Sequence, residues 1–249
     1  MYSYEILSNF YDDFLLNEVD YEKYKEFILN EFKKTSLNFN NYLDLACGTG
    51  NLSLLISENF KKTTCIDISE NMLSIAYNKF LDKRIPASFL NIDICDFSLN
   101  EEFSLVTCCL DSINYILDEG DLLDCFKCTY DSLEPGGVFI FDMNSKHKIK
   151  DELGNNVFIF DEEKVFCIWE NEYEDDVLDM YLTFFVKEGN NYKRFEEYHS
   201  ERAYDVSEIE SLLKKAKFSD IKYFNDYSYD EVTEDSSRIT FVVRKQENQ

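Results

Sequence analysis

The chain has 249 residues, of which 45% are hydrophobic, and its 50 Asp and Glu residues against 25 Lys and Arg residues give a formal net charge of -25. This length and hydrophobic content allow one large core, with or without a smaller subdomain, and argue against extensive disorder. The negative charge argues against a nucleic-acid partner, because phosphate binding needs an accumulated positive surface. The N-terminus shows no secretory signal, and no apolar run reaches the length of about 18 residues that a membrane-spanning helix needs. We therefore expect a cytoplasmic protein whose eight cysteines are reduced.

The first forty residues are predicted to be helical, because apolar side chains recur at spacings of three and four. The stripe begins with Ile6, Phe10 and Phe14 and resumes after an interruption at residues 17–20. The tyrosines of this region, Tyr11 among them, are interpreted either as packing residues or as part of a lid over a pocket.

Residues 41–50 read Asn-Tyr-Leu-Asp-Leu-Ala-Cys-Gly-Thr-Gly and precede an amphipathic segment at residues 51–60. A short apolar run that ends in glycines before such a segment is typical of a strand, a tight turn and a helix. Gly48 and Gly50 let the backbone turn sharply and let a ligand approach main-chain N–H groups, and the following helix directs the positive end of its dipole to the same place. The stretch therefore predicts a nucleotide pocket.

The second predicted strand, residues 63–67, ends on Asp67, seventeen positions after Gly50. In a strand–turn–helix–strand unit, this spacing brings the carboxylate beside the glycine turn, where it could accept both hydroxyl protons of a ribose. Asp67 could instead cap the next helix, but Ser69 is better suited to that role. We favour the ribose interpretation.

The third and fourth predicted strands, residues 87–93 and 103–110, also lead into polar segments. Asp93 and Ile94 could offer a carboxylate to an exocyclic amine and a backbone N–H to a ring nitrogen, as recognition of adenine requires. Ligands of open α/β sheets bind beyond the carboxyl ends of strands. The mouth of the pocket is therefore expected to include Leu110, Asp111, Ser112 and Asn114.

Two groups of cysteines are given no chemistry. Cys125 and Cys128 form a lone Cys-x-x-Cys inside a predicted helix at residues 121–133, without further ligands at zinc spacing, so we interpret them as packing residues and expect no metal site. Cys47 lies in the glycine turn but has no basic neighbour that would activate its thiol.

Beyond a turn at residues 134–137 and a fifth strand at 138–142, the pattern changes to alternating apolar and polar residues rich in Phe, Tyr and Val. This alternation predicts an antiparallel sheet inserted into an α/β chain. We expect one domain from residues 1–145 and 205–249 and an inserted subdomain at 146–204, which could cover an acceptor pocket or form a dimer interface. A capping box at Ser207 and two final strands, residues 218–227 and 238–244, return to the main pattern.

Together these residues resemble the class I S-adenosylmethionine-dependent methyltransferases over nearly the whole chain. The resemblance rests on residues 43–50, on Asp67 and Asp93, on the turn at residues 134–137 and on the late segment Ala-Lys-Phe at 216–218. It implies an α/β fold: a Rossmann-like seven-strand, mostly parallel sheet with one antiparallel strand and helices on both faces. Within the family the chain is most similar to small-molecule enzymes with a β-insertion after the fifth strand, a group that includes amino-sugar N-methyltransferases.

The resemblance implies S-adenosylmethionine as cofactor, with its methionine part at the glycine turn, its ribose at Asp67 and its adenine at Asp93 and Ile94. The expected cofactor pocket consists of Tyr11, Asp44, Ala46, Cys47, Gly48, Gly50, Asp67, Ile68, Met72, Asp93, Ile94 and Leu110. Ala46 replaces the first glycine of the family motif, Lys217 the usual late glycine, and Ser104 an acid at the start of the fourth strand. We expect cofactor binding to tolerate these departures.

The predicted function is transfer of a methyl group to a nitrogen or oxygen of a small-molecule acceptor, by a monomer or by a homodimer formed through the inserted sheet. A non-catalytic cofactor-binding subunit and a nicotinamide-dependent oxidoreductase are the alternatives, although Ser53 stands where a dinucleotide motif has its third glycine.

Tyr11 and His199 are the candidate catalytic residues: the resemblance implies that an aromatic residue of the Tyr11 region lies over the methionine end of the cofactor, and His199 is a candidate base. His147 is interpreted as a solvated loop residue. The candidate acceptor contacts are Asp111, Asn114, Tyr198 and Arg202. Alternation places Tyr198 and Arg202 on one face of the last inserted strand and His199 on the other, and the sequence does not decide which face points to the pocket.

Overall fold

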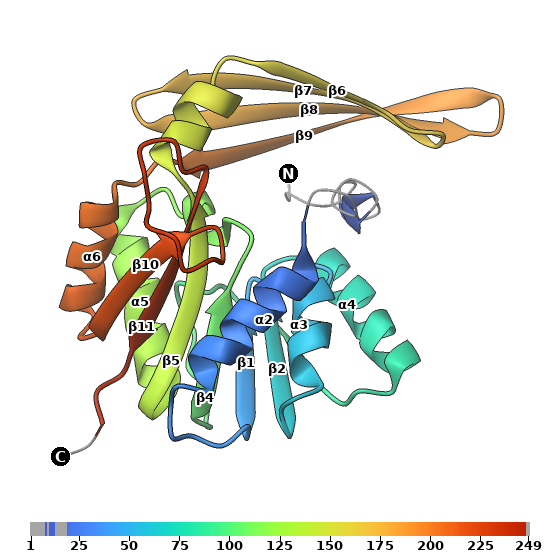
Figure 1. Ribbon diagram of the computed structural model, residues 1–249. Helices are drawn as coiled ribbons and strands as arrows, with labels where there is room; N and C mark the ends of the chain where they lie inside the picture. Colours follow the sequence, from blue (N-terminus) through green and yellow to red (C-terminus); the bar gives the residue numbers. More distant parts are fainter. Residues whose placement is uncertain (1–7, 9, 13–18, 248–249) are drawn as a thin grey trace.

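The computed structural model describes residue 8, residues 10–12 and residues 19–247. A larger sheet has helices on both faces, and a smaller sheet lies across one end of it (Figure 1). Ile6 and Phe14, from the predicted N-terminal helices, lie outside the described residues, whereas Phe10 packs against the core of the smaller sheet.

The larger sheet has seven strands in the order β10-β11-β5-β4-β1-β2-β3. The first five strands along the chain run parallel, and β11 runs antiparallel to both of its neighbours. This confirms the predicted seven-strand sheet with one antiparallel strand. Its strands are β1 (Asn41–Leu45), β2 (Lys62–Asp67), β3 (Ser88–Asn91), β4 (Phe103–Cys108), β5 (Leu133–Asn144), β10 (Ser219–Asn225) and β11 (Arg238–Arg244).

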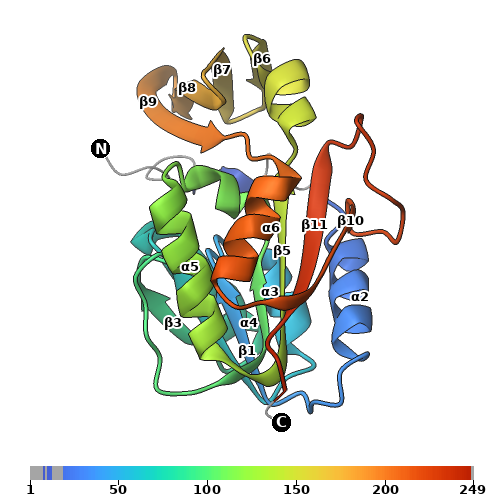
Figure 2. The same ribbon diagram turned by 90° about the vertical axis from the view of Figure 1, so that its left-hand side faces the viewer.

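Helices cover both faces of this sheet, as Figure 2 shows. Alternate residues of β5 reach opposite sides: Val138 and Ile140 pack towards α2 and α3, whereas Phe139 and Phe141 pack towards α5 and α6. The fourth helix, α4, packs beside α3 against β2 and β3. The helices are α2 (Tyr21–Phe32), α3 (Asn51–Ser57), α4 (Glu70–Lys83), α5 (Glu119–Ser132) and α6 (Val206–Lys215), with short helical segments η2 (Ser112–Tyr115) and η3 (Lys148–Leu153).

Two local predictions are corrected. The predicted turn at residues 134–137 lies within β5, where the register with β4 shifts between the Phe103 pair and the Leu105 pair. The capping box at Ser207 does not form, because α6 begins at Val206 after Asp205, and the carboxylate of Glu208 pairs with Arg202. By contrast, Ser69 caps α4 as predicted, accepting a 3.3 Å hydrogen bond from Met72 N.

The smaller sheet consists of β6 (Val157–Asp161), β7 (Val165–Glu174), β8 (Val177–Glu188) and β9 (Asn191–Arg202), all antiparallel and in chain order. It is inserted between β5 and α6, as predicted. Its inner face is apolar, with Cys167, Leu178 and Phe184 packed against Ile149 of η3. The domain boundaries at residues 146 and 204 stay an interpretation.

In the described part of the chain, no helix is long and apolar enough to cross a membrane. The cytoplasmic location stays a prediction.

Candidate active site

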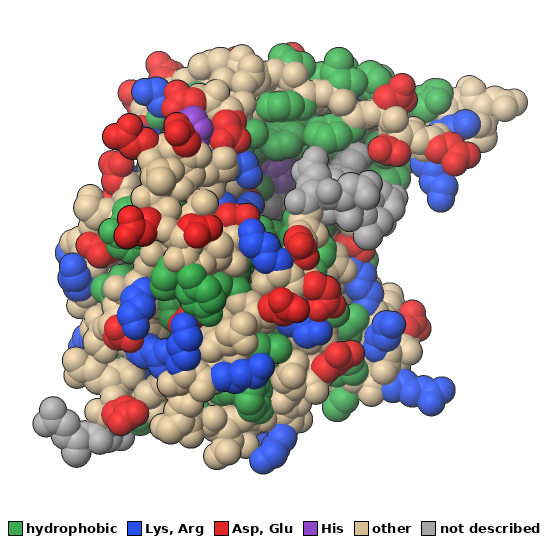
Figure 3. Space-filling view, in the orientation of Figure 1, with side chains coloured by type: hydrophobic (Ala, Val, Ile, Leu, Met, Phe, Trp, Pro, Cys, Tyr) green, Lys and Arg blue, Asp and Glu red, His purple; other side chains and the backbone are tan. Residues whose placement is uncertain are grey.

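A cavity of about 1810 Å³ lies between the carboxyl ends of the parallel strands and the inner face of the inserted sheet. Figure 3 shows the molecule hollowed between these two parts. One wall comes from the glycine turn and the segments after β2, β3 and β4, and the other from β7, β8 and β9. The residues predicted from the strand ends and those predicted from the inserted sheet therefore meet at one site.

The glycine turn between β1 and α3 has left-handed backbone at three positions, with φ values of 52° at Ala46, 55° at Gly48 and 76° at Gly50. A Cβ on Gly50 would lie 2.9 Å from the Cβ of Ala76 on α4, so only glycine fits between the two helices. Ala46 and Gly48 line the cavity, whereas Gly50 is buried behind it and shapes the turn.

Asp67 ends β2 beside this turn, as the spacing predicts. Its Oδ2 accepts a hydrogen bond of 2.8 Å from Gly48 N and its Oδ1 one of 2.8 Å from Ser69 N. Burial raises the pKa of this carboxyl, and the main-chain donors oppose the rise. Each carboxylate oxygen has a second lone pair, so the group, which lines the cavity, can still accept hydroxyl protons of a ribose.

Asp44 lies behind the turn rather than on the cavity wall. Its carboxylate accepts hydrogen bonds from the hydroxyls of Ser53 and Thr107, the latter at 2.5 Å. Burial raises its pKa to about 6, although both hydroxyls oppose this rise. Asp44 therefore ties β1 to α3 and β4, and any contact with a ligand is indirect. Cys47 is likewise absent from the cavity wall, and its thiol lies beside Cys65.

The segments after β2 and β3 supply a further part of the wall. Asp93, Ile94 and Met72 line the cavity, together with Ile68, whose side chain is largely exposed. Asp93 Oδ1 accepts a 2.8 Å hydrogen bond from Cys95 N, which turns the chain at this point. A carboxylate, a main-chain amide and apolar side chains are what a purine base requires.

The N-terminal region reaches the site through Tyr11. Its ring lies near Gly48, since a Cβ on that glycine would be 4.0 Å from Tyr11 Cε1. The neighbouring Asp12 accepts hydrogen bonds from Thr49 Oγ1 at 2.6 Å and Asn51 Nδ2 at 2.9 Å, and forms a 2.6 Å ion pair with Lys79. Burial raises the pKa of Asp12, but these partners outweigh it and lower the pKa. Asp12 thereby holds Tyr11 against the glycine turn.

The segment after β4 is held by Asp142 of β5. This fully buried carboxylate accepts hydrogen bonds of 2.8 Å from Leu110 N and Asp111 N, and it also pairs with Arg238. Leu110 and Asp111 have φ values of 59° and 54°, a strained backbone that this clamp maintains. Both residues line the cavity, and the carboxylate of Asp111 forms a 2.7 Å ion pair with Arg238.

Asn114 does not reach the cavity, although the sequence predicts it as an acceptor contact. Its side chain is fully buried, donates to Arg202 O at 2.9 Å and accepts from Asn144 N at 2.9 Å. These bonds join η2 to β5 and β9, so its amide has a structural role.

The inner face of the inserted sheet carries His199, which resolves the ambiguity left by the sequence. His199 lines the cavity, 4% exposed, and its ring lies edge-on to Tyr115 with centroids 6.0 Å apart. Its Nε2 lies 3.3 Å from Glu197 Oε2.

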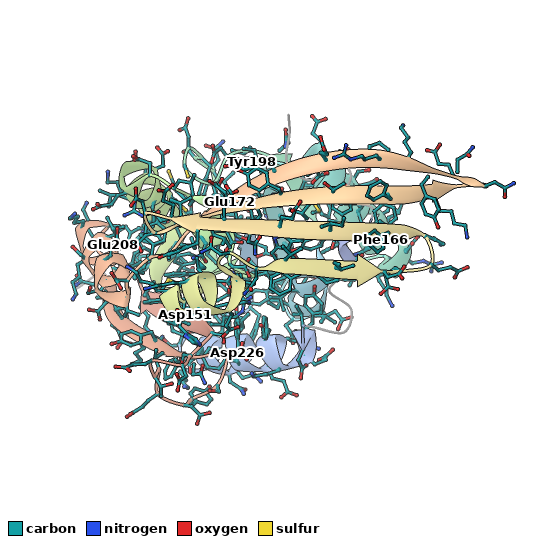
Figure 4. The ribbon with its side chains drawn as sticks, turned by 90° about the horizontal axis from the view of Figure 1, so that it is seen from above. Asp151, Phe166, Glu172, Tyr198, Glu208 and Asp226 are labelled. Carbon is teal, nitrogen blue, oxygen red and sulfur yellow. The ribbon has the colours of Figure 1, made fainter. Side chains whose placement is uncertain are left out.

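Tyr198 lies on the outer face, which Figure 4 shows from above, and is half exposed. Its hydroxyl donates a hydrogen bond of 2.5 Å to Asp179 Oδ1. Arg202 on that side pairs with Glu208. The prediction that these two residues contact the acceptor is therefore not supported.

Several residues of this wall were not predicted from the sequence. Glu201 and Asn144 are buried polar residues that line the cavity, and Trp169, Met180 and Leu182 supply its apolar part. Alternation along the strand could have identified Glu201, because residues 199 and 201 lie on the same face of a strand and residue 198 lies on the other.

The strand order, the glycine turn and the acids at the ends of β2 and β3 define a nucleoside-binding α/β protein of the class I methyltransferase type. In agreement, residues 43–137 match the model of a methyltransferase domain. A putative methyltransferase of Bacillus subtilis, YqeM, is 31% identical over 245 residues, covering 97% of both chains.

Two crystal structures extend this similarity. A S-adenosylmethionine-dependent methyltransferase from Clostridium acetobutylicum is 43% identical, with a TM-score of 0.90 over 98% of this chain and 99% of that one. The sugar N-methyltransferase KedS8 from Streptoalloteichus is 20% identical, with a TM-score of 0.79 over 95% of this chain and 93% of that one, and so shares the fold. The chain therefore belongs to the S-adenosylmethionine-dependent methyltransferases, and it is an enzyme with S-adenosylmethionine as its cofactor.

Proposed function

We propose that this enzyme methylates a nitrogen or oxygen of a small-molecule acceptor, which enters between the cofactor residues and the inner face of the inserted sheet. The observation that carries the proposal is the continuity of the cavity from Asp67 to Trp169 and His199. Single-ligand pockets usually have volumes of about 300–1,000 Å³. The volume of about 1810 Å³ thus suits a cofactor and a second small molecule together.

The cofactor residues are proposed from their positions on the wall. Asp67 would bind the ribose, Asp93 and Ile94 the adenine, and the turn around Gly48 the methionine part. The set fits this ligand because Asp67 and Asp93 offer carboxylate acceptors to its hydroxyl and amine groups, and because Gly48, which has no side chain, leaves room beside the turn. When bound, S-adenosylmethionine supplies an electrophilic methyl group on a sulfonium, and the protein's contribution is to align the acceptor with it.

Two residues are proposed to act on the reacting groups. Tyr11 approaches the glycine turn, where its ring and hydroxyl would orient the methyl end of the cofactor. His199 lies on the opposite wall, where it could remove a proton from the acceptor. Asp111, which also lines the cavity, is proposed as an acceptor contact.

The charge of the wall favours a cationic or neutral acceptor. Its described residues include two basic side chains, those of Lys148 and Arg238, and Arg238 is already paired. The acidic side chains on the wall are those of Asp67, Glu70, Asp93, Asp111, Asp118, Asp121, Glu201, Asp226 and Asp235. KedS8, which shares this fold, is named as a sugar N-methyltransferase, which supports a small-molecule acceptor for a protein of this architecture.

The test is to incubate the enzyme with S-adenosylmethionine labelled in its methyl group and a cell extract divided by ultrafiltration. We expect label in one or more products from the low-mass fraction, identified by mass spectrometry, and none in protein or nucleic acid. Label confined to the macromolecular fraction would overturn the proposal.

With the acceptor in hand, Tyr11→Phe should lower the rate of transfer more than it weakens cofactor binding. Equal turnover of the variant at saturating cofactor would refute the role of Tyr11. We also propose a monomer or a homodimer formed through the inserted sheet, which sedimentation equilibrium distinguishes.

A further inference from the structure

Glu201 is a buried carboxyl group on the acceptor side of the cavity. It lies on the inner face of β9, in the row of His199, and is 3% exposed. Its Oε2 accepts a 3.0 Å hydrogen bond from Asn144 Nδ2. Among the described residues, no Lys or Arg lies within ion-pair distance of it, and Lys148 and Arg238 act on its charge only from further away.

Asn144 provides a second acceptor at the same place. The residue ends β5, is 3% exposed and lines the cavity. Its Oδ1 is buried and accepts no hydrogen bond from the residues that the structure describes. A buried carbonyl without a donor costs free energy, and together with the neighbouring carboxyl it matches a ligand group that carries more than one N–H.

We propose that the methyl acceptor is an amine, which Glu201 and Asn144 Oδ1 bind as its ammonium and which Glu201, in place of His199, then deprotonates. This rests on the proposed function, the methylation of a small molecule. In the proton transfer an N–H bond breaks, its electron pair stays on nitrogen, and an O–H bond forms on the carboxylate. The ammonium becomes a neutral amine with a free lone pair, and Glu201 becomes a neutral carboxylic acid.

The environment of Glu201 suits this proton transfer. Burial raises its pKa to about 8, with a further contribution from Asp111, whereas Asn144, Lys148 and Arg238 lower it. His199 is the titratable neighbour on its own strand, and the residue opposite it on β8 is the apolar Leu178. The equilibrium for proton transfer from an ammonium of pKa about 10 to an ordinary glutamate is unfavourable by about six powers of ten. For a glutamate of pKa about 8, it is unfavourable by only about two powers of ten.

The apolar side chains of the cavity wall near Glu201 indicate that the non-amine part of the acceptor is apolar. Cys167, Trp169, Met180 and Leu182 line the cavity on β7 and β8, on the same face as Glu201. An amine with an apolar body would bury that body against these side chains.

The test uses the full-length protein saturated with S-adenosylhomocysteine, which prevents turnover. Calorimetry measures the binding of benzylamine, phenethylamine and hexylamine, each against the alcohol of the same skeleton. Titrations at pH 7 in two buffers of different ionisation enthalpy give the number of protons released. Glu201→Gln is compared with Glu196→Gln, which changes an exposed carboxylate on the outer face of the same strand.

We expect at least one amine to bind about 10-fold more tightly than its alcohol, because hydrogen bonds to a charged group are the stronger ones. Its binding to wild type should release most of one proton at pH 7, because a carboxyl of pKa about 8 is mostly protonated before an ammonium binds. Glu201→Gln should lose both the preference and the release, and Glu196→Gln should keep both.

The proposal is overturned if no amine binds better than its alcohol, or if Glu201→Gln keeps the proton release. Detection of an O-methylated low-mass product from the extract would also overturn it while leaving the proposed function intact. Label found only in macromolecules would instead overturn the proposed function itself.

Discussion

Replacement of Gly50 by alanine tests how the glycine turn between β1 and α3 packs against α4. With φ at 76°, an alanine there costs about 1–2 kcal/mol in backbone strain. Its Cβ would also lie 2.9 Å from the Cβ of Ala76, which forces α3 and α4 apart, and overpacking of this kind costs about 1–3 kcal/mol. We therefore expect Gly50→Ala to lower the free energy of unfolding by about 2–5 kcal/mol in urea denaturation followed by circular dichroism.

Gly189, in the turn between β8 and β9, is the matched control. Its φ is 63°, and no atom of the residues that the structure describes lies within 4 Å of an added Cβ, so Gly189→Ala should cost only the backbone strain of about 1–2 kcal/mol. Adding Ala76→Gly to Gly50→Ala should recover the steric part, although Ala76→Gly alone costs about 1 kcal/mol in a helix. Equal losses in the two glycine variants, or no recovery in the double variant, would refute the packing argument.

Three further predictions concern buried carboxyls. Asp67→Asn should weaken the binding of S-adenosylhomocysteine, measured by calorimetry, by about 10–100-fold, because the NH₂ group of an amide cannot accept a hydrogen bond from a main-chain N–H as the second carboxylate oxygen does. Asp82→Asn, on the exposed side of α4, is the control. Unchanged affinity in Asp67→Asn would contradict the proposed ribose contact. Asp142→Asn should lower the free energy of unfolding by about 3–5 kcal/mol, since it leaves Arg238 buried without its full counter-charge, and a loss below about 1 kcal/mol would contradict this. For Asp44 the pKa is raised from 3.8 to about 6, so the folded protein binds the proton more tightly and stability falls as pH rises through that window, by up to about 3 kcal/mol. Denaturant titrations at several pH values should show that the stability of wild type, measured relative to Asp44→Asn, falls as the pH rises from about 4 to about 6. An increase in this relative stability over the same range would show that the pKa of Asp44 is lowered rather than raised.

The cofactor side of the site could be predicted from the sequence because its geometry is local. In a strand–turn–helix–strand unit, the second strand pairs beside the first, so its carboxyl end lies next to the glycine turn. The position of Asp67 therefore follows from its spacing to Gly50. The structure places Asp67 beside the glycine turn, as predicted, where it accepts a hydrogen bond from Gly48 N. Even here the sequence did not distinguish Asp44, which supports the turn from behind, from residues on the cavity wall.

The acceptor side depended on the tertiary structure. Alternation established which residues of β9 share a face, but the face that turns to the cavity is decided by how the inserted sheet packs on η3 through Ile149 and its neighbours. That packing turns His199 and Glu201 inward and leaves Tyr198 in solvent. The sequence thus determined the donor of the methyl group, through short-range spacing along one chain segment. Only the tertiary structure brought together the residues of the proposed acceptor side, because they come from elements far apart in the chain and meet through burial of the inserted sheet's apolar face.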